Sequence, residues 1–374
     1  MRAWTFTERG LPTKVLKLRH DVPQPQATDL RPNEVIVKVS HVALNAPIAS
    51  LMAVMPHFTS NIWIPNYEFS GIITAIGEEG GSRQLREGDA VFGMIGPQDW
   101  MRYNGATAEY IIVPRVCVAV KPLNITFEQA AGLAGSSCTV VDLAAKAGLL
   151  VVEHGADGPR IRSHAQGKNI LVTGGSTSTG ISMLQLVRYL VGEEVLVVTP
   201  ASPRNREAVL TYGADIVIDY TQHPDLHAYL LKHYTSEPFD AIIDISGSDE
   251  QLYRRSPAYL RPSGSYAFTG SMKHSHAVPD GSAVGAAMWF SAFVRLPLSW
   301  ILHMIRPVVL GGIPRRCFFH SGQPTVTNLE LVRQLAAGGI FKIIVDSVWD
   351  MEDALHGFDH VAEGKIRGKV IVKV

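Results

Sequence analysis

The hydrophobic pattern changes near residue 169. Apolar runs are short and irregularly spaced before this point, and they recur at regular spacing after it. Before that point, short apolar runs are separated by Pro, Gly and Asp, a pattern that predicts β-strands. The expected strands are Glu34–Val39, Gly71–Ala75, Ala90–Phe92 and Glu109–Val113. A helix is expected after Thr126, where Gln129 stands in position to complete a capping box. The first ~130 residues are therefore predicted to be β-rich.

The pattern becomes regular from about Asn169. Apolar strand-like runs follow one another at spacings of 25, 20, 25 and 25 residues, and each gap holds a segment that can form a helix. The runs centre near Val172, Val197, Val217, Ile242 and Ala267. This alternation is typical of repeated βα units that build a parallel sheet.

Two further segments lie outside these patterns. Residues 151–166 (VVEHGADGPRIRSHAQ), just before the regular region, are polar and contain glycine, which indicates an inserted surface loop. After Thr325, the pattern predicts helix, strand, helix and strand. These elements are expected at Thr327–Ala337, Ile343–Val348, Met351–Glu363 and Lys369–Val374. They could extend the parallel sheet or complete the N-terminal β domain, and the sequence leaves both open.

Composition narrows the class of protein. A chain of 374 residues favours two domains, and its 46% hydrophobic and 18% charged content is typical of a globular enzyme. The formal net charge of zero gives no sign of a nucleic-acid partner. The three cysteines are widely spaced and form no C-x-x-C pair, which indicates a reducing compartment. The first residues show no apolar signal core, so a cytoplasmic location is expected.

One uncharged stretch, Gly281–Val294, is too short for a transmembrane segment, which needs roughly 20 apolar residues. Three interpretations remain open for it: a substrate-pocket or packing helix, an oligomer interface, or a membrane-surface contact.

The strongest candidate for chemistry is the passage from Asn169 to Val191. An apolar run, Ile170–Thr173, meets the small residues Gly174–Gly180 and then a helical pattern. Such a strand-turn-helix passage leaves backbone N–H groups at a helix N-terminus, where they can bind the pyrophosphate of a dinucleotide. The alternative is a purely structural turn.

The end of the next strand bears on which dinucleotide is bound. NAD sites usually carry an acidic residue there, but the strand Val195–Thr199 runs into PASPRNRE with no acid before Glu207. Ser202, Arg204 and Arg206 stand there instead. Guanidinium groups match phosphate oxygens, so the sequence predicts NADPH rather than NADH. The alternative is that both arginines are merely solvated residues at a helix start.

Longer motifs carry a resemblance to a known family. They are MRAW (Met1–Trp4), PNEVIVKVSHVALN (Pro32–Asn45), P-x-x-E-x-S-G (Pro65–Gly71), EGDAVFG (Glu87–Gly93), GATAEYIIV (Gly105–Val113), FEQAAGL (Phe127–Leu133), YGADIVIDY (Tyr212–Tyr220), FDAIIDISG (Phe239–Gly247) and the closing GKIRGKVIVKV. The chain resembles the zinc-independent, quinone-oxidoreductase-like branch of the medium-chain dehydrogenase/reductase superfamily over essentially its whole length. It is similar within that branch to mitochondrial reticulon-interacting oxidoreductases and to fungal trans-acting enoyl reductases.

The resemblance implies an α/β fold in which a Rossmann doubly wound parallel sheet is inserted into a GroES-like β-rich catalytic domain. The expected bounds are 1–140 and 315–374 for the catalytic domain and 141–314 for the NADPH-binding domain. The implied activity is NADPH-dependent reduction of an activated C=C bond or a quinone.

The resemblance also implies site residues. The cofactor-binding set comprises Gly174, Gly175, Ser176, Thr177, Ser178, Thr179 and Gly180 at the pyrophosphate, Ser202, Arg204, Arg206 and Tyr220 at the adenosine phosphate, and Ser246, Phe318, Phe319 and Lys369 elsewhere along the cofactor. Asn45 and Thr139 would lie near the nicotinamide.

The sequence departs from the family pattern in two places. Thr177 and Ser178 stand where two glycines are common, and the stretch Asn45–Ile48 lacks its usual acidic residue. Zinc is not expected, because no cysteine lies near Asn45 and Tyr67 replaces the ligand histidine before Glu68. Glu68 is then expected to be structural.

Without a metal, a hydrogen-bond donor must stabilise the charge that develops on the substrate oxygen. The candidates are Asn45, Tyr67 and Thr139, although Tyr67 could be a packing residue and Asn45 a turn residue. A group of bulky apolar residues indicates a large polyketide-like or quinone-like substrate. These are Trp289, Phe290, Phe293, Trp300, Leu302 and Met304.

Two other functions remain open: an NADPH-binding assembly protein without turnover, and a non-redox isomerase or cyclase. A monomer or homodimer, and a biosynthetic partner enzyme, are both compatible with the sequence.

Overall fold

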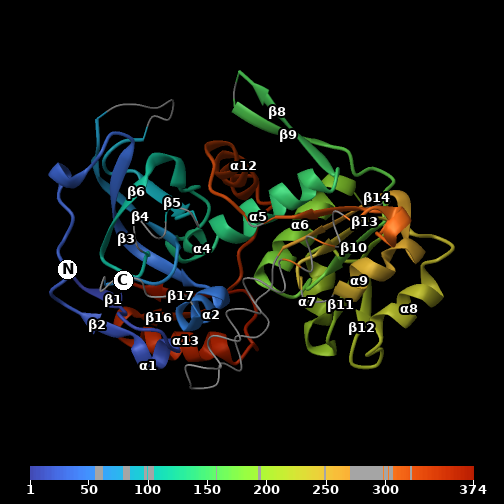
Figure 1. Cartoon of the computed structure of the whole chain (residues 1–374). Coiled ribbons are helices and arrows are strands. Elements are labelled where there is room, and N and C mark those ends of the chain that lie inside the picture. The colour runs from blue at the N-terminus through green and yellow to red at the C-terminus, as the bar shows by residue number, and fades with distance from the viewer. Residues whose placement is uncertain are drawn as a thin grey trace. The chain divides into compact units, whose positions relative to one another are not determined.

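The computed structural model describes the chain except for residues 55–61, 79–84, 97–98, 100–104, 157, 193–194, 248–249, 270–297, 299–301, 303–305 and 321. The described residues form two compact units (Figure 1). Unit 1 contains Met1–Cys138 and Gln323–Val374, and unit 2 contains the described residues from Thr139 to Gly322.

Unit 1 is built on a seven-stranded sheet in the order β16-β17-β3-β4-β5-β7, with β6 paired to β3. Its strands are β3 (Glu34–Leu44), β4 (Glu68–Ile76), β5 (Ala90–Met94), β6 (Tyr110–Pro114), β7 (Val118–Val120), β16 (Val345–Asp350) and β17 (Lys369–Lys373), beside a separate pair, β1 (Ala3–Thr5) and β2 (Lys17–Arg19). The four strands expected before residue 130 are thereby confirmed as β3 to β6.

The helices of unit 1 are α1 (Pro12–Val15), α2 (Ala46–Val54), α4 (Phe127–Ala131), α12 (Val326–Ala337) and α13 (Ala354–Ala362), with short 3₁₀ turns at η1 (Ala27–Asp29), η2 (Arg115–Cys117) and η8 (Met351–Asp353). The predicted capping box is confirmed at α4, where the Gln129 backbone N–H donates to the Thr126 hydroxyl (3.3 Å) and the Thr126 backbone N–H donates to the Gln129 side chain (3.0 Å). Helix α5 (Ala134–Lys146) contains the boundary between the two units.

The C-terminal segment completes the N-terminal β domain, which decides between the two alternatives. Strand β17 pairs antiparallel with β3, so that Val370 lies opposite Leu44 and Lys373 opposite His41. The first four residues of β17 are all buried, as expected of a strand covered on both faces. Strand β16 then adds parallel to β17.

Unit 2 is a six-stranded parallel sheet in the order β12-β11-β10-β13-β14-β15. Its strands are β10 (Ile170–Thr173), β11 (Val197–Ala201), β12 (Ile216–Asp219), β13 (Phe239–Asp244), β14 (Leu260–Phe268) and β15 (Arg316–Phe319). Its helices are α6 (Ser178–Val191), α7 (Arg206–Thr211), α8 (Leu226–His233) and α9 (Glu250–Arg255), with η3 (Pro203–Asn205), η4 (Ser256–Ala258) and η7 (Val308–Leu310). Numbered from β10, the order is 3-2-1-4-5-6, which is that of a Rossmann sheet.

The five strands expected from the apolar rhythm are confirmed as β10 to β14. The sixth, β15, pairs with β14 through Cys317 opposite Tyr266 and Phe319 opposite Phe268. The expected return to the catalytic domain at residue 315 therefore falls inside unit 2, and unit 1 resumes at Gln323. Strand β15 is only four residues long, and so short a run of apolar residues does not indicate which sheet it joins.

The prediction of a surface loop at 151–166 is wrong. Strands β8 (Leu150–Gly155) and β9 (Gly158–Ser163) form an antiparallel hairpin, separate from the six-stranded sheet (Figure 1). The sequence signal was the run of Gly and Asp near the middle of this segment, because these residue types are typical of turns between strands. The Ser163 hydroxyl anchors the hairpin by donating to the Leu190 carbonyl at 2.6 Å.

Within the described residues, none of the helices combines the length and the apolar character that crossing a bilayer requires. The apolar stretch Gly281–Val294 lies outside the described residues, as do Trp289, Phe290, Phe293, Trp300 and Met304. Leu302 is described and is exposed.

Candidate active site

The turn after β10 needs glycine at three positions. Gly174 has a φ of +66°, and a Cβ there would lie 3.1 Å from the backbone N of Ser246. A Cβ on Gly175 would collide with the Thr199 hydroxyl, and one on Gly180 with the Gly174 carbonyl. The turn therefore packs closely against the backbone of Gly174 and Ser246 and against the Thr199 side chain at the carboxyl end of β10.

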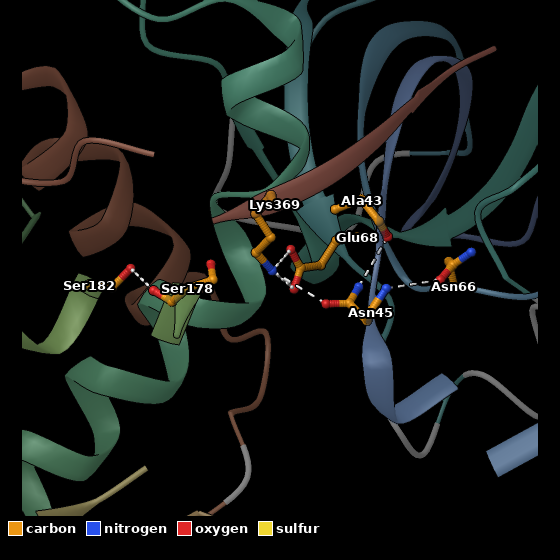
Figure 2. Close-up of polar contacts among 7 residues, drawn as sticks. All are labelled: Ala43, Asn45, Asn66, Glu68, Ser178, Ser182 and Lys369. Carbon is orange, nitrogen blue, oxygen red and sulfur yellow. Dashed lines mark hydrogen bonds and ion pairs between the residues drawn. The ribbon is translucent and has the colours of Figure 1, made fainter. Parts of the chain in front are cut away.

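The missing central glycine has a structural explanation at Thr177. This residue is the N-cap of α6: its hydroxyl accepts from the Gly180 N–H (3.0 Å) and donates to the Gly174 carbonyl (2.8 Å). Farther along α6, the Ser182 hydroxyl donates to the Ser178 carbonyl at 3.2 Å (Figure 2). The side chains at this turn thus tighten the turn itself.

This geometry fits the pyrophosphate of a dinucleotide. Helix α6 begins at the carboxyl edge of the sheet, where β10 has β11 on one side and β13 on the other. Ligands of open α/β sheets bind at such a switch point, and a helix N-terminus there favours an anion. Ser176, Ser178 and Thr179 lie around this N-terminus and are partly exposed.

The end of β11 carries the predicted phosphate-binding residues. Ser202 is partly buried, and Arg204, Arg206 and Tyr220 are exposed. One guanidinium nitrogen of Arg206 donates to the Val217 carbonyl at 3.4 Å, which holds that side chain along β12.

Asp219 is a residue here that the sequence reasoning missed. It lies opposite Ala201 in the β11–β12 register. Its carboxylate accepts from the Thr221 hydroxyl (2.7 Å) and backbone N–H (2.9 Å), and these bonds lower its pKa. The parallel sheet itself was the signal, because strands that are neighbours in the sheet end at the same edge.

A buried carboxylate, Asp244, lies at the carboxyl end of β13. Its side chain accepts from the hydroxyls of Thr173, Ser246 (2.7 Å) and Tyr266 (2.7 Å) and from the Gly247 N–H (2.8 Å). Burial, with Asp244 beside it, raises the pKa of Tyr266 well above its usual range, so the phenol stays a donor. The predicted cofactor residue Ser246 is thus fixed next to Gly174 by this network.

The predicted site residues of β15 and α5 lie near a pair of side chains, His320 and Asp142, that the sequence reasoning missed. Phe318 and Phe319 are in β15, and the Phe319 ring packs on Phe268 with 5.3 Å between centroids. The next residue, His320, contacts the Asp142 carboxylate of α5 at 2.6 Å from Nε2. Thr139 lies one helical turn before Asp142.

In unit 1, Lys369 contacts the predicted site residue Asn45 and the carboxylate of Glu68, both of which are distant in the sequence (Figure 2). Its ammonium donates to both Glu68 oxygens (3.0 and 2.9 Å) and to the Asn45 side-chain oxygen (3.3 Å). The Asn45 amide nitrogen donates in turn to the Ala43 carbonyl at 3.1 Å. The backbone N–H of Asn45 donates to the side chain of Asn66, which holds a φ of +63°.

The cluster Asn45–Glu68–Lys369 is almost completely buried, with Glu68 1% and Lys369 5% exposed. Burial raises the pKa of Glu68, and Lys369 and the Gly135 backbone N–H act in the opposite direction. A Cβ on Gly135 would collide with the Glu68 carboxylate, so glycine is needed for this contact. Burial, with a smaller contribution from Glu68, also raises the pKa of the neighbouring Tyr67 and keeps its hydroxyl protonated.

These residues do not suit a zinc ion. The carboxylate of Glu68 already faces a lysine ammonium, and neither cysteine nor histidine is among its partners within the described residues. Throughout the part of the chain that the structure describes, no group of three His, Cys, Asp or Glu side chains could hold a metal.

Comparisons with known proteins agree with this architecture. Residues 31–122 match the "Alcohol dehydrogenase GroES-like domain" family, and residues 212–372 match the "Zinc-binding dehydrogenase" family. The trans-enoyl reductase poxH of Penicillium oxalicum is 31% identical, with 100% of this chain and 98% of that protein covered. The medium chain reductase pydE of Acremonium sp is 30% identical, with 100% and 99% covered.

Solved structures show the same fold at lower identity. The quinone oxidoreductase from Coxiella burnetii superposes with a TM-score of 0.71 at 22% identity, covering 100% of this chain and 99% of that chain. Mycobacterial Rv1454c, solved in complex with NADPH, superposes with a TM-score of 0.68 at 19% identity, covering 100% of both chains.

Proposed function

The chain belongs to the zinc-independent enoyl and quinone reductase branch of the medium-chain dehydrogenase/reductase family, and from this premise we propose that it is an NADPH-dependent reductase of an activated C=C bond or a quinone. The observation that carries the proposal is the tightly packed glycine turn at the switch point of a 3-2-1-4-5-6 sheet. When bound there, NADPH supplies a hydride from its nicotinamide ring.

The residues of unit 2 have the chemistry to bind that cofactor. Gly174, Gly175 and Gly180 let the turn pack closely at the end of β10, and Thr177 fixes its shape. Arg204 and Arg206 offer guanidinium groups for the 2′-phosphate, with Ser202 and Tyr220 nearby. Asp219 opposes this preference, because its carboxylate would repel a phosphate, and its bonds to Thr221 hold it in place.

Three donors are proposed to stabilise the substrate oxygen. Tyr67 has a phenol whose raised pKa keeps it protonated, and Thr139 offers a hydroxyl. Among the described residues, the Asn45 amide donates one hydrogen to Ala43 and its oxygen accepts from Lys369, and we assign its second amide hydrogen to the substrate. In this proposal, Lys369 positions Asn45.

Cofactor preference is tested by the double substitution Arg204→Ala/Arg206→Ala. Loss of charge-assisted bonds worth about 1.5–3 kcal/mol should weaken NADPH binding by roughly 10- to 100-fold and leave NADH binding nearly unchanged. Arg160→Ala/Arg162→Ala in the hairpin removes the same charge from unit 2 and is the matched control. Equal losses for the two cofactors would reject a role in 2′-phosphate binding.

Turnover is tested by NADPH consumption with a panel of enones and quinones. Activity with long apolar substrates over short polar enals is expected from the bulky apolar residues between 289 and 304, and the trans-enoyl reductases among the relatives support reduction of an enoyl group. The comparisons favour a reductase over an assembly protein or an isomerase. Tight NADPH binding without turnover on any substrate would favour one of those two.

Location and assembly stay predictions. Cys117, Cys138 and Cys317 are free thiols, which suits a reducing compartment and supports the expected cytoplasmic location. A small-molecule substrate follows from the branch, whereas the choice between monomer and homodimer, and a biosynthetic partner enzyme, rest on the sequence alone. Sedimentation at several protein concentrations would determine the oligomeric state.

A further inference from the structure

His320 and Asp142 form a close contact outside the residues assigned above to cofactor binding and to the substrate oxygen. His320 Nε2 lies 2.6 Å from Asp142 Oδ2, and the two side chains are 18% and 21% exposed. This geometry holds the imidazole through one nitrogen and leaves Nδ1 as the nitrogen not used by the contact. A carboxylate that contacts one imidazole nitrogen in this way fixes the orientation of the ring.

The pair lies at the carboxyl edge of the unit 2 sheet. The registers align Thr173 with Asp244, Asp244 with Phe268, and Phe268 with Phe319. The residue that follows this row on β10 is Gly174, where the cofactor turn begins, and the residue that follows it on β15 is His320. The His320 backbone N–H donates to the Phe268 carbonyl at 3.0 Å, so His320 continues the strand pairing.

The position along the edge is where the redox half of a bound dinucleotide would be expected. Three strand spacings of about 4.8 Å place the end of β15 roughly 14 Å from the end of β10. If a dinucleotide placed its pyrophosphate at the β10 turn and its adenosine phosphate toward Arg204 at the end of β11, its other half would extend over β13, β14 and β15.

Thr139 lies next to this pair, on the same helix as Asp142 and against the chain that follows His320. It precedes Asp142 by three residues on α5, and residues at that spacing share one helix face. A Cβ on Gly322 would collide with the Thr139 hydroxyl, so the chain just after His320 passes directly against Thr139. A proposed oxygen-stabilising donor and the histidine pair therefore lie on one side of α5.

We propose, on the basis of the proposed function, that His320 is the acid that completes C=C reduction and that Asp142 positions it. Hydride addition to the β-carbon leaves the electron pair of the C=C bond in an enolate. The His320 Nδ1–H bond then breaks, a Cα–H bond forms with that electron pair, and the carbonyl is restored. The neutral imidazole keeps its Nε2–H on Asp142 and regains a proton from water at Nδ1.

Quinones provide the discriminating comparison. A reduced quinone takes its protons on oxygen, which exchanges protons with water readily, whereas an enolate needs a proton on carbon. His320→Gln should therefore lower enone turnover by roughly 100- to 1,000-fold, as expected for a lost general acid, and change quinone turnover by no more than about twofold. His360→Gln removes the matched His360–Asp346 contact (2.7 Å) in unit 1 and should change neither rate.

Two further variants test the pair as a unit. Asp142→Asn keeps His320 and should lower enone turnover by less than His320→Gln does. The double variant should be no slower than His320→Gln alone, because residues that act together give non-additive losses. If His320→Gln fails to fold, Asp142→Asn supplies the same enone-to-quinone comparison.

The stereochemistry of protonation gives a readout besides rate. In D₂O, the wild type should place deuterium on one face of the α-carbon of an α-methyl enone, and His320→Gln should lose that selectivity while binding NADPH with unchanged affinity. Equal losses for enones and quinones, or retained facial selectivity, would overturn this inference and leave the proposed function intact. A wild type that reduces neither substrate class would overturn both.

Discussion

The two units each bury a carboxylate, and they accommodate it in different ways. In unit 1, Glu68 faces the ammonium of Lys369, so the buried charge is balanced by an opposite charge. In unit 2, the carboxylate of Asp244 accepts from three hydroxyls and one backbone N–H, all of them neutral groups. An ion pair depends on both of its partners, whereas a set of neutral donors shares the stabilisation among many groups.

The difference has a structural origin. Glu68 lies on β4 and Lys369 on β17, and each strand is next to β3 in the sheet, so their side chains meet from either side of the Asn45 end of β3. The donors to Asp244 come from the ends of β10, β13 and β14, where polar side chains gather at the carboxyl edge. The first arrangement links strand β4 to the C-terminal strand β17, and the second fixes Ser246 next to Gly174 at the glycine turn.

The largest expected effect is at the ion pair. Glu68→Gln leaves the Lys369 ammonium buried opposite a neutral amide, and breaking a buried pair in this way costs about 3–5 kcal/mol. Denaturant unfolding combined with hydrogen exchange should show this loss in unit 1 alone. The double variant Glu68→Gln/Lys369→Met should recover part of it, and a loss below about 1 kcal/mol for Glu68→Gln would contradict the comparison.

A smaller loss is expected at the neutral network. Asp244→Asn keeps an acceptor oxygen toward Thr173, Ser246 and Gly247 and can donate to the Tyr266 hydroxyl, so about 1–3 kcal/mol of stability should be lost, in unit 2. The same unfolding measurement applies. NADPH affinity should fall as well, because Ser246 lies against Gly174. If Asp244→Asn cost as much as Glu68→Gln, the distinction between the two units would fail.

Alkaline pH should weaken both units through buried thiols. Burial raises the pKa of Cys117 in unit 1 and of Cys317 in unit 2 to about 12, from an ordinary value of 9.0. Between pH 9 and 12 the unfolded thiol ionises while the folded thiol keeps its proton, so stability falls by about 1.4 kcal/mol per pH unit for each thiol.

This pH effect can be assigned to each unit separately. Cys117→Ala should flatten the alkaline loss of stability in unit 1 only, and Cys317→Ala in unit 2 only, as measured by unfolding at a series of pH values. Below pH 9 both variants should show no change in slope from these thiols. An unchanged slope in either variant would show that its thiol ionises as readily in the folded state as in the unfolded state.

The smallest effects are expected at two matched helix caps. Thr126→Ala in unit 1 and Thr177→Ala in unit 2 each remove a capping hydroxyl, at a cost of about 1 kcal/mol. Only Thr177→Ala should also weaken NADPH binding, because its hydroxyl bonds to the Gly174 carbonyl within the turn. Cofactor titration of both variants is the measurement, and equal affinities would mean that Thr177 acts as a helix cap alone.

Sequence reasoning succeeded where the chemistry is local. The capping box at Thr126 and Gln129 lies within four residues, and each βα unit carries its own apolar strand and helical segment. It failed for the hairpin at 150–163 and for β15, whose short strands depend on the partner with which they pair. The predicted cofactor residues Gly174 to Gly180 and Ser246 come together in unit 2, and Asn45 joins Lys369 in unit 1.

The amino-acid pattern alone predicted the strand-turn-helix passage at 169–191, the rhythm of the parallel strands and the helices that follow Thr126 and Thr325, because these follow from backbone geometry and from neighbours a few residues apart. Only the tertiary structure decided which sheet the last strands join and which buried groups meet. Lys369 and Glu68 are 301 positions apart and His320 and Asp142 are 178 apart, and no local periodicity can specify contacts at such separations. Strand pairing brings Lys369 and Glu68 together because burying the apolar strands β4 and β17 leaves these side chains to pair with polar groups inside the protein.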